Sequence, residues 1–187
     1  MTHRTDAKKN RSGVTFIEIM IVITIIGILA VTAIIAMSPA KSMAKMEAAQ
    51  KELESEITLA KAYALQGKIQ NISGTPKTPC GYGIWFPSET QYVIYYNQDT
   101  DCETANADNS KKHHSSSSYE VVRKTLSGGI KISNWSGMEV YFTVPNARVH
   151  NGSGNELTSG FLSISLTDGT ISKTVSVNSL GIVIAEE

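Results

Sequence analysis

A single carboxylate stands in the most apolar stretch of the chain. Glu18 is the only charged residue among positions 14–36, a run of 23 residues that contains no proline. The helix dipole would stabilise an exposed carboxylate in a first turn by less than about 1 kcal/mol. An unpaired carboxylate inside a bilayer costs at least about 2.5 kcal/mol. We therefore expect Glu18 to pair with a positive charge in an apolar environment.

Two cysteines, Cys80 and Cys102, lie well beyond this stretch. An even number of cysteines in an oxidising compartment indicates a disulfide. If Phe86 pairs with Gln91 in a hairpin, Cys80 falls opposite Asn97, and a turn after Asn97 would return Cys102 to it. Metal binding by the two cysteines is disfavoured, because the chain has no further cysteine and no matching pair of histidines.

Asn97, Asp99 and Asp101 place side-chain oxygens at alternate positions, as a calcium-binding loop does. However, Cys102 stands where such a loop needs glycine, and Asp108 stands where it needs a bidentate glutamate. A solvated loop is the favoured interpretation. Calcium is the one metal for which the sequence offers a weak candidate site, and we expect no other cofactor.

The sequence contains no G-x-S-x-G, H-E-x-x-H, P-loop or G-x-G-x-x-G motif, so we expect no enzymatic activity. His113-His114 follow Lys111-Lys112, but four serines come next and no aromatic residue is interleaved, which favours a polar loop. Without residues 1–13 the chain has 13 basic and 16 acidic residues. This mildly acidic balance argues against a nucleic-acid partner.

The element that carries Glu18 has the length of a membrane span. A helix over positions 14–36 would extend about 35 Å, enough for a hydrocarbon core of about 30 Å. Positions 1–13 hold four basic residues and one acidic residue, a head that should stay in the cytoplasm. A secretory signal peptide does not account for this segment, because it has a shorter apolar region followed by a small-residue cleavage site. A plain signal anchor leaves Glu18 unexplained.

The segment Gly13-Val14-Thr15-Phe16-Ile17-Glu18, after a short basic leader and before an apolar helix, resembles the class III prepilin signal. That signal belongs to the type IV pilins and to the pseudopilins of type II secretion. The resemblance implies that a prepilin peptidase cleaves between Gly13 and Val14 and N-methylates Val14, although Phe is the usual first residue. Glu18 would then pair with the amino terminus of a neighbouring subunit during assembly. The inner-membrane assembly platform would be a further partner.

Residues 40–66 lack glycine and proline and favour a second, amphipathic helical half, with Gly67 as its C-terminal cap. Its expected apolar face includes Met43, Met46, Leu53, Ile57, Ala60 and Ala64. Pro39 should bend or loosen the helix without ending it. The predicted organisation is a leader (1–13), a transmembrane and filament-core helix (14–39), an amphipathic helix (40–67) and a β-rich globular domain (68–187).

The globular domain alternates β-branched and aromatic runs with turns. Pro87–Thr90 is the expected loop of a first hairpin, and 149–159 is expected to be a loop. Asp168-Gly169 predicts a two-residue hairpin turn that places Leu166 opposite Ile171. The expected strands are 81–86, 91–96, 119–126, 130–134, 138–143, 161–167, 170–177 and 180–184.

The predicted class is α+β, with a long N-terminal helix packed on antiparallel sheet. This layout and the C-terminal Ser-Val-Asn-Ser-Leu-Gly-Ile segment are similar to GspH-type minor pseudopilins and related minor pilins. The resemblance implies a non-enzymatic, single-pass subunit of the inner membrane. Its globular domain would lie outside the cytoplasm and would join an extracytoplasmic filament. The alternative is a DNA-uptake or adhesive pilin, whose nearest basic candidates are Lys111-Lys112 and Arg123-Lys124.

Overall fold

The computed structural model describes residues 14–72, 74–99, 101–102 and 120–186, with the side chains of 33–38 left out. The chain forms two compact units, residues 1–41 and residues 42–187, and each is described by itself. The leader 1–13, including Gly13, lies outside the described residues, as do Lys111-Lys112, His113-His114 and Asp108.

Helix α1 runs over Phe16–Gln66 and continues through Pro39, as the sequence predicted. It begins after Thr15, whose carbonyl oxygen accepts the N–H of Glu18 at 3.1 Å. It ends at Gly67, whose φ of 57° is left-handed. The N–H of Lys68 bonds to the carbonyl of Tyr63 at 3.0 Å, and the N–H of Gly67 bonds to that of Ala64 at 3.3 Å. These two bonds form a Schellman cap, so the predicted cap at Gly67 is confirmed.

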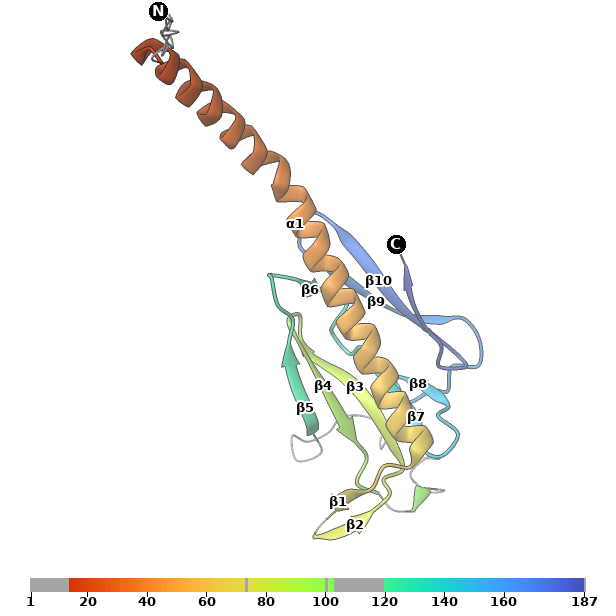
Figure 1. Ribbon diagram of the computed structural model, residues 1–187. Coiled ribbons are helices and arrows are strands. Elements are labelled where there is room, and N and C mark those ends of the chain that lie inside the picture. The colour runs from red at the N-terminus through yellow and green to blue at the C-terminus, as the bar shows by residue number, and fades with distance from the viewer. Residues whose placement is uncertain (1–13, 73, 100, 103–119, 187) are drawn as a thin grey trace, which may run out of the picture. The chain divides into compact units, whose positions relative to one another are not determined.

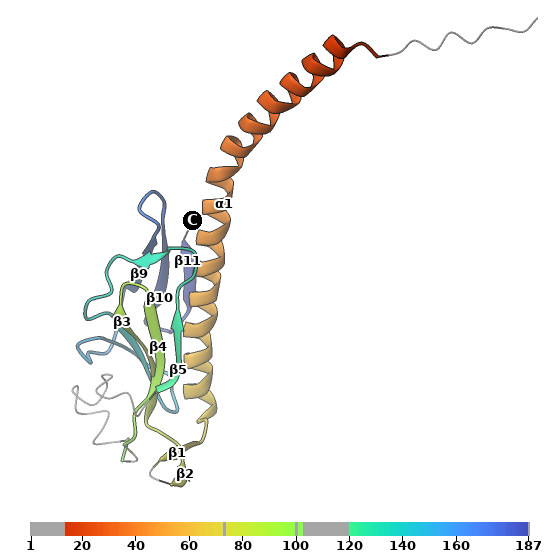
Figure 2. The same ribbon diagram turned by 90° about the vertical axis from the view of Figure 1, so that its left-hand side faces the viewer.

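The second unit adds a small hairpin and two antiparallel sheets to the second half of α1 (Figures 1 and 2). The hairpin pairs β1 (Gln70–Ile72) with β2 (Thr75–Lys77). The five-stranded sheet has the order β5 (Glu120–Thr125), β4 (Gln91–Tyr96), β3 (Gly81–Ser88), β7 (Glu139–Thr143), β8 (Val149–Asn151). The four-stranded sheet has the order β11 (Val183–Glu186), β10 (Ser172–Asn178), β9 (Phe161–Thr167), β6 (Lys131–Ile132).

One face of α1 meets both sheets in a single apolar core, so the predicted α+β class is confirmed. The residues that α1 buries there are Met46, Ala49, Leu53, Ile57, Ala60 and Ala64. Met43 is 48% exposed, against expectation, because it lies in the first turn of the unit, at the rim of the core. Gln50 is buried instead, and its amide donates to the carbonyls of Thr174 and Glu186 at 2.9 and 2.8 Å.

The register of the β9–β10 hairpin differs from the prediction by two residues. Ile164 pairs with Val175, and Leu166 pairs with Lys173 rather than with Ile171. The Asp168 carboxylate accepts the N–H groups of Thr170 and Ile171 at 2.8 Å each, which draws both residues into a four-residue loop. A shift of two keeps every side chain on its predicted face, because side chains alternate with a period of two.

The β3–β4 hairpin also turns later than predicted. Ser88 pairs with Gln91, which leaves Glu89-Thr90 as the loop, and a register shift lies between Trp85 and Ser88. Pro87 within that shift has no N–H to donate to a ladder, so a bulge is expected there.

The predicted loop 149–159 begins with a strand, β8, which pairs with β7. Val149 and His150 are buried, and Val149 lies opposite Phe142. The chain reverses between them through a tight turn, in which the N–H of Ala147 bonds to the carbonyl of Thr143 at 2.6 Å. This pairing depends on a neighbouring strand, and the polar composition of the segment concealed it.

Candidate assembly segment and exported domain

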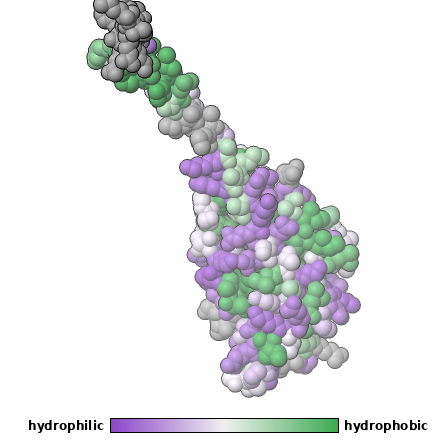
Figure 3. Space-filling view, in the orientation of Figure 1, coloured by the Kyte–Doolittle hydropathy of each residue, from purple (hydrophilic) through white to green (hydrophobic). Residues whose placement is uncertain are grey.

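The first unit exposes large apolar side chains along its helix, and Figure 3 shows part of this apolar surface on the face that it draws. Its large apolar side chains are exposed by 47% to 78%, from Val14 and Phe16 at the start to Val31. The hydroxyl of Thr24 donates to the carbonyl of Met20 at 2.8 Å, and that of Thr32 donates to the carbonyl of Leu29 at 2.9 Å. Because these hydroxyls bond within the helix, the surface offers apolar contact rather than hydrogen bonds. Such a large exposed apolar surface marks a site of interaction with protein or lipid.

Glu18 interrupts this surface in the first turn of α1. Its side chain is exposed, and it forms no ion pair with any described residue. Val14 lies one helical turn before it and is 67% exposed. The partner charge that the sequence predicts for Glu18 therefore has to come from outside the described part of this chain, or from a newly formed amino terminus at Val14.

The structure contains the disulfide between Cys80 and Cys102, with a Cα–Cα distance of 5.0 Å. Cys80 directly precedes β3 and is fully buried. The expected register differs slightly, because Asn97 bonds through its N–H to the carbonyl of Gly81 at 3.0 Å. The bridge fastens the segment that follows β4 to the start of β3.

One side-chain oxygen of the weak calcium candidate is already engaged within the loop. The side-chain oxygen of Asn97 accepts the N–H of Asp99 at 2.8 Å, which closes an Asx turn within the weak calcium candidate. Asp101 lies outside any helix or strand. Among the described residues, no group of three or more His, Cys, Asp or Glu side chains is placed to hold a metal ion.

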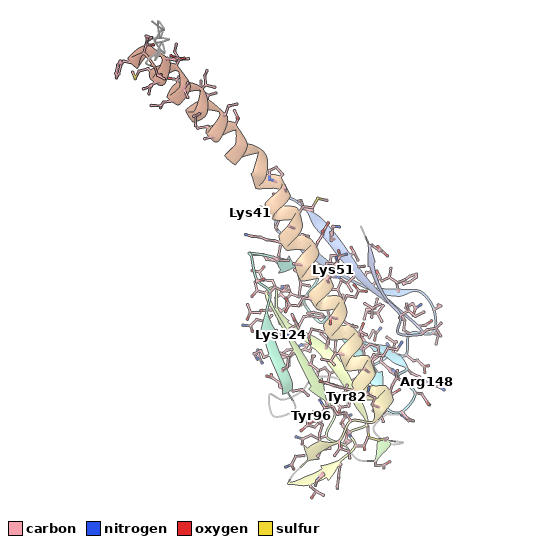
Figure 4. The ribbon with its side chains drawn as sticks, viewed as in Figure 1. Lys41, Lys51, Tyr82, Tyr96, Lys124 and Arg148 are labelled. Atoms are coloured by element: carbon pink, nitrogen blue, oxygen red, sulfur yellow. A yellow bond between two sulfur atoms is a disulfide. The ribbon has the colours of Figure 1, made fainter. Side chains whose placement is uncertain are left out.

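The described basic candidates for DNA contact face acidic partners. Lys124, which is labelled in Figure 4, donates to the carboxylate of Glu56 on α1 and lies 3.9 Å from that of Glu52. The hydrogen bond to Glu56 raises the pKa of Lys124. Arg123 pairs with Glu120 at 2.5 Å. Because these cations are paired within the domain, β5 offers little uncompensated positive charge to a phosphate backbone.

The end of the chain also departs from the sequence prediction. Leu180 and Ile182, expected within the last strand, lie in the turn before β11 and are 71% and 50% exposed. The side-chain oxygen of Asn178 accepts the N–H groups of Leu180 and Ile182 at 2.9 and 2.8 Å. The sequence did not predict that these two residues are exposed, because an aliphatic run of this kind is also typical of a buried strand.

An α+β protein whose N-terminal helix is apolar in its first half and carries one carboxylate in its first turn has the organisation of a pilin-like subunit. The chain carries the prokaryotic N-terminal methylation motif, whose family profile matches residues 8–34. This match confirms the predicted resemblance to the type IV pilins and pseudopilins over the N-terminal segment. No curated protein matches the sequence significantly.

Two crystal structures of the type IV minor pilin FimU of Pseudomonas aeruginosa, from two crystal forms, are similar to the chain. The TM-scores are 0.49 and 0.46, with sequence identities of 11% and 10%. The alignments cover 80% and 75% of this chain and 93% and 92% of the FimU chains. Similarity of this degree carries no conclusion about function.

Measured by length and mean hydropathy, none of the helical stretches described here qualifies as a membrane span.

Proposed function

We propose that the chain is a non-enzymatic prepilin, stored in the cytoplasmic membrane and assembled into the filament of a type II secretion system or a type IV pilus. The observation that carries this proposal is the helix surface over residues 14–32, apolar on all sides, with Glu18 as its only charge. Its position inside the matched methylation motif supports the same conclusion. A surface of this kind is suited to lipid before assembly and to neighbouring helices afterwards.

Processing by a prepilin peptidase supplies the partner charge of Glu18. Cleavage between Gly13 and Val14 creates an α-amino group, whose reference pKa of about 8 makes it largely cationic at neutral pH. N-methylation of Val14 leaves that cation in place. The Glu18 carboxylate of one subunit then attracts the amino terminus of its neighbour, and the attraction is strong where apolar helices exclude water. This pairing guides a subunit from the membrane into the growing filament.

The layout of helix and strands favours a minor subunit at or near the filament tip. Its partners in this role are other pilin or pseudopilin subunits and the inner-membrane assembly platform. The pairing of Arg123 and Lys124 with acidic side chains argues against the alternative of a DNA-binding pilin. Calcium binding through Asn97, Asp99 and Asp101 remains a weak secondary proposal, which titration of the purified protein with calcium tests.

N-terminal sequencing of the chain recovered from membranes and from sheared filaments tests processing. The expected first residue is Val14, carrying one additional methyl group by mass. A bulky substitution such as Gly13→Leu should retain the leader, whereas Gly13→Ala should still be cleaved. A mature chain that begins elsewhere would overturn the proposal.

A further inference from the structure

The two central strands of the four-stranded sheet carry their only charge on the inner side. β9 and β10 contribute Ile164 and Val175 to the core that they share with α1. Lys173 of β10 lies on the same inner side, where its side chain is 10% exposed and 3.9 Å from Glu47 of α1. Because side chains alternate along a strand, the other face of both strands points away from α1. We call it the outer face.

The outer face of β9 and β10 is uncharged and consists largely of hydroxyl groups. Across the two strands, three successive pairs on this face contain only serine and threonine. Neighbouring strands lie about 4.8 Å apart, and successive pairs on one face lie about 6.8 Å apart along the strand. The hydroxyls therefore form two regular rows, which we call the hydroxyl ladder. Its pairs are Ser163–Ser176, Ser165–Thr174 and Thr167–Ser172.

Three of the six hydroxyls in the ladder can bond to a ligand. Ser163 and Ser176 bond to each other at 3.0 Å, and Thr167 donates to the carbonyl of Ile171 at 3.1 Å. The other three hydroxyls bond to no residue in the described part of the chain, and they belong to Ser165, Ser172 and Thr174. A hydroxyl both donates and accepts, so these groups suit a partner that carries hydroxyls of its own.

Two aromatic side chains flank one end of the ladder. Phe161 lies on the same face of β9, two residues beyond Ser163, and is 58% exposed. Trp135, in the segment after β6, is 36% exposed. The side chain of Asn134 fixes that segment to β9, because it donates to the carbonyl of Ser163 at 2.8 Å and accepts the N–H of Ser165 at 3.1 Å. Exposed aromatic rings offer large, rigid, apolar contact surfaces.

We propose that the outer face binds a neutral glycan chain. A sugar ring has hydroxyl groups around its edge and C–H groups on its faces. The hydroxyl ladder bonds to the former, and the rings of Phe161 and Trp135 contact the latter. The ladder together with Phe161 extends about 20 Å along the strands, which leaves room for several sugar rings in a row.

The charge distribution of the sheet favours an uncharged ligand. Within the described sheet, outward charges lie only on the two edge strands, at Lys131, which pairs with Glu89, and at Glu186. A charged ligand on the two central strands would lose water without gaining an opposite charge, which is costly. The inference rests on the proposed function in one respect, since that function places this domain outside the cytoplasm, where cell-wall and surface glycans occur.

Retention of the purified full-length chain, in detergent, on chitin, cellulose and amylose resins tests the inference. A dextran sulfate resin is the charged control. We expect retention on at least one neutral resin, insensitive to salt because no ion pair contributes, and none on the sulfated resin. Replacing both Phe161 and Trp135 with alanine should weaken binding by at least about tenfold, equivalent to about 1.4 kcal/mol. Phe161→Tyr keeps a ring and should bind as the wild type does.

A second double variant, Ser165→Ala with Thr174→Val, tests the ladder separately. It removes two hydroxyls and leaves both aromatic rings, so binding should weaken by at least about threefold. The matched control is Ile69→Ala, which removes an apolar side chain that is 63% exposed and lies outside the four-stranded sheet. This control should bind as the wild type does.

Absence of retention on all three neutral resins, or equal retention of the wild type and both double variants, would overturn the inference. Loss of the double variants from sheared filaments with unchanged retention would assign the outer face to a protein contact, and would overturn it as well. If the wild-type chain never enters filaments, the proposed function fails. Retention on the resins then still decides the inference by itself.

Discussion

Asp168 accepts a hydrogen bond from the hydroxyl of Ser42, so the loop between β9 and β10 touches α1 at the first residue of the globular unit. The same carboxylate also accepts the N–H groups of Thr170 and Ile171. Asp168 therefore shapes its own loop and fastens that loop to the helix.

The hydrogen bonds that Asp168 accepts predict a pH dependence of stability. The Ser42 hydroxyl, followed by the N–H groups of Ile171 and Thr170, lowers the pKa of Asp168 from 3.8 to about 2. Because the folded-state pKa is depressed, this stabilisation is complete above about pH 4 and is lost as the pH falls towards about 2. Asp168→Asn should lower the unfolding temperature near neutral pH, and the difference from wild type should vanish near pH 2. Thermal unfolding across this range measures it.

Glu89→Gln provides the control for Asp168. Glu89 pairs with Lys131 at 2.8 Å on the exposed surface, where an ion pair contributes about 0–1 kcal/mol. If Asp168→Asn lowered the unfolding temperature by the same amount at every pH, this would contradict the role assigned to the ionised carboxylate.

Glu18→Val should block assembly without blocking processing. The substitution makes the apolar segment continuous, so membrane insertion is at least as favourable, and cleavage depends mainly on Gly13 and the leader. A charge pair 4 Å apart attracts by about 4 kcal/mol at an effective dielectric constant of 20, so recovery in sheared filaments should fall more than about tenfold. Immunoblots measure the amount of the variant in the sheared filaments relative to the membrane fraction.

Ile21→Val, on the same helix surface, is the matched control and should assemble normally. A subunit at the tip would retain part of its incorporation, because no neighbour follows it. Full incorporation of Glu18→Val would remove the assembly role of Glu18.

Replacing both Cys80 and Cys102 with serine should lower the free energy of unfolding by about 3 kcal/mol, the effect expected for a closed loop of this size. The two residues are separated by 22 positions. Denaturant unfolding of the oxidised wild type and of the double variant measures the difference, and reduced wild type should match the variant. Membrane insertion should be unchanged. Two free thiols in exported wild-type protein would contradict the prediction.

Gly83→Ala should destabilise the domain strongly. A Cβ at Gly83 would lie 2.5 Å from the ring of Tyr95, which is buried on the outer face of the five-stranded sheet. Displacing that ring should cost about 1–3 kcal/mol, as overpacking does. Gly27→Ala is the contrasting variant, because a Cβ there has no atom within 4 Å and alanine favours the helix. In chemical denaturation, the free energy of unfolding should fall for Gly83→Ala and should rise or stay unchanged for Gly27→Ala.

The sequence alone determined the features that depend on a few neighbouring residues. The motif around Gly13 and Glu18, the continuation of the helix past Pro39 and the cap at Gly67 all follow from local chemistry. Most of the strands were predicted as well, since a period of two in side-chain polarity is visible within six residues. The buried face of α1 was largely predicted from its 3–4 spacing.

Tertiary structure decided which segments pair and in what register. The polarity pattern of β9 and β10 fits registers two residues apart equally well, and the hydrogen bonds of Asp168 select one of them. Burial of Gln50 in place of Met43 depends on carbonyl groups that β10 and β11 bring to the helix. The exposure of Leu180 likewise depends on where the last strand begins. The contacts of Gln50 span 124 and 136 positions, which no local pattern encodes.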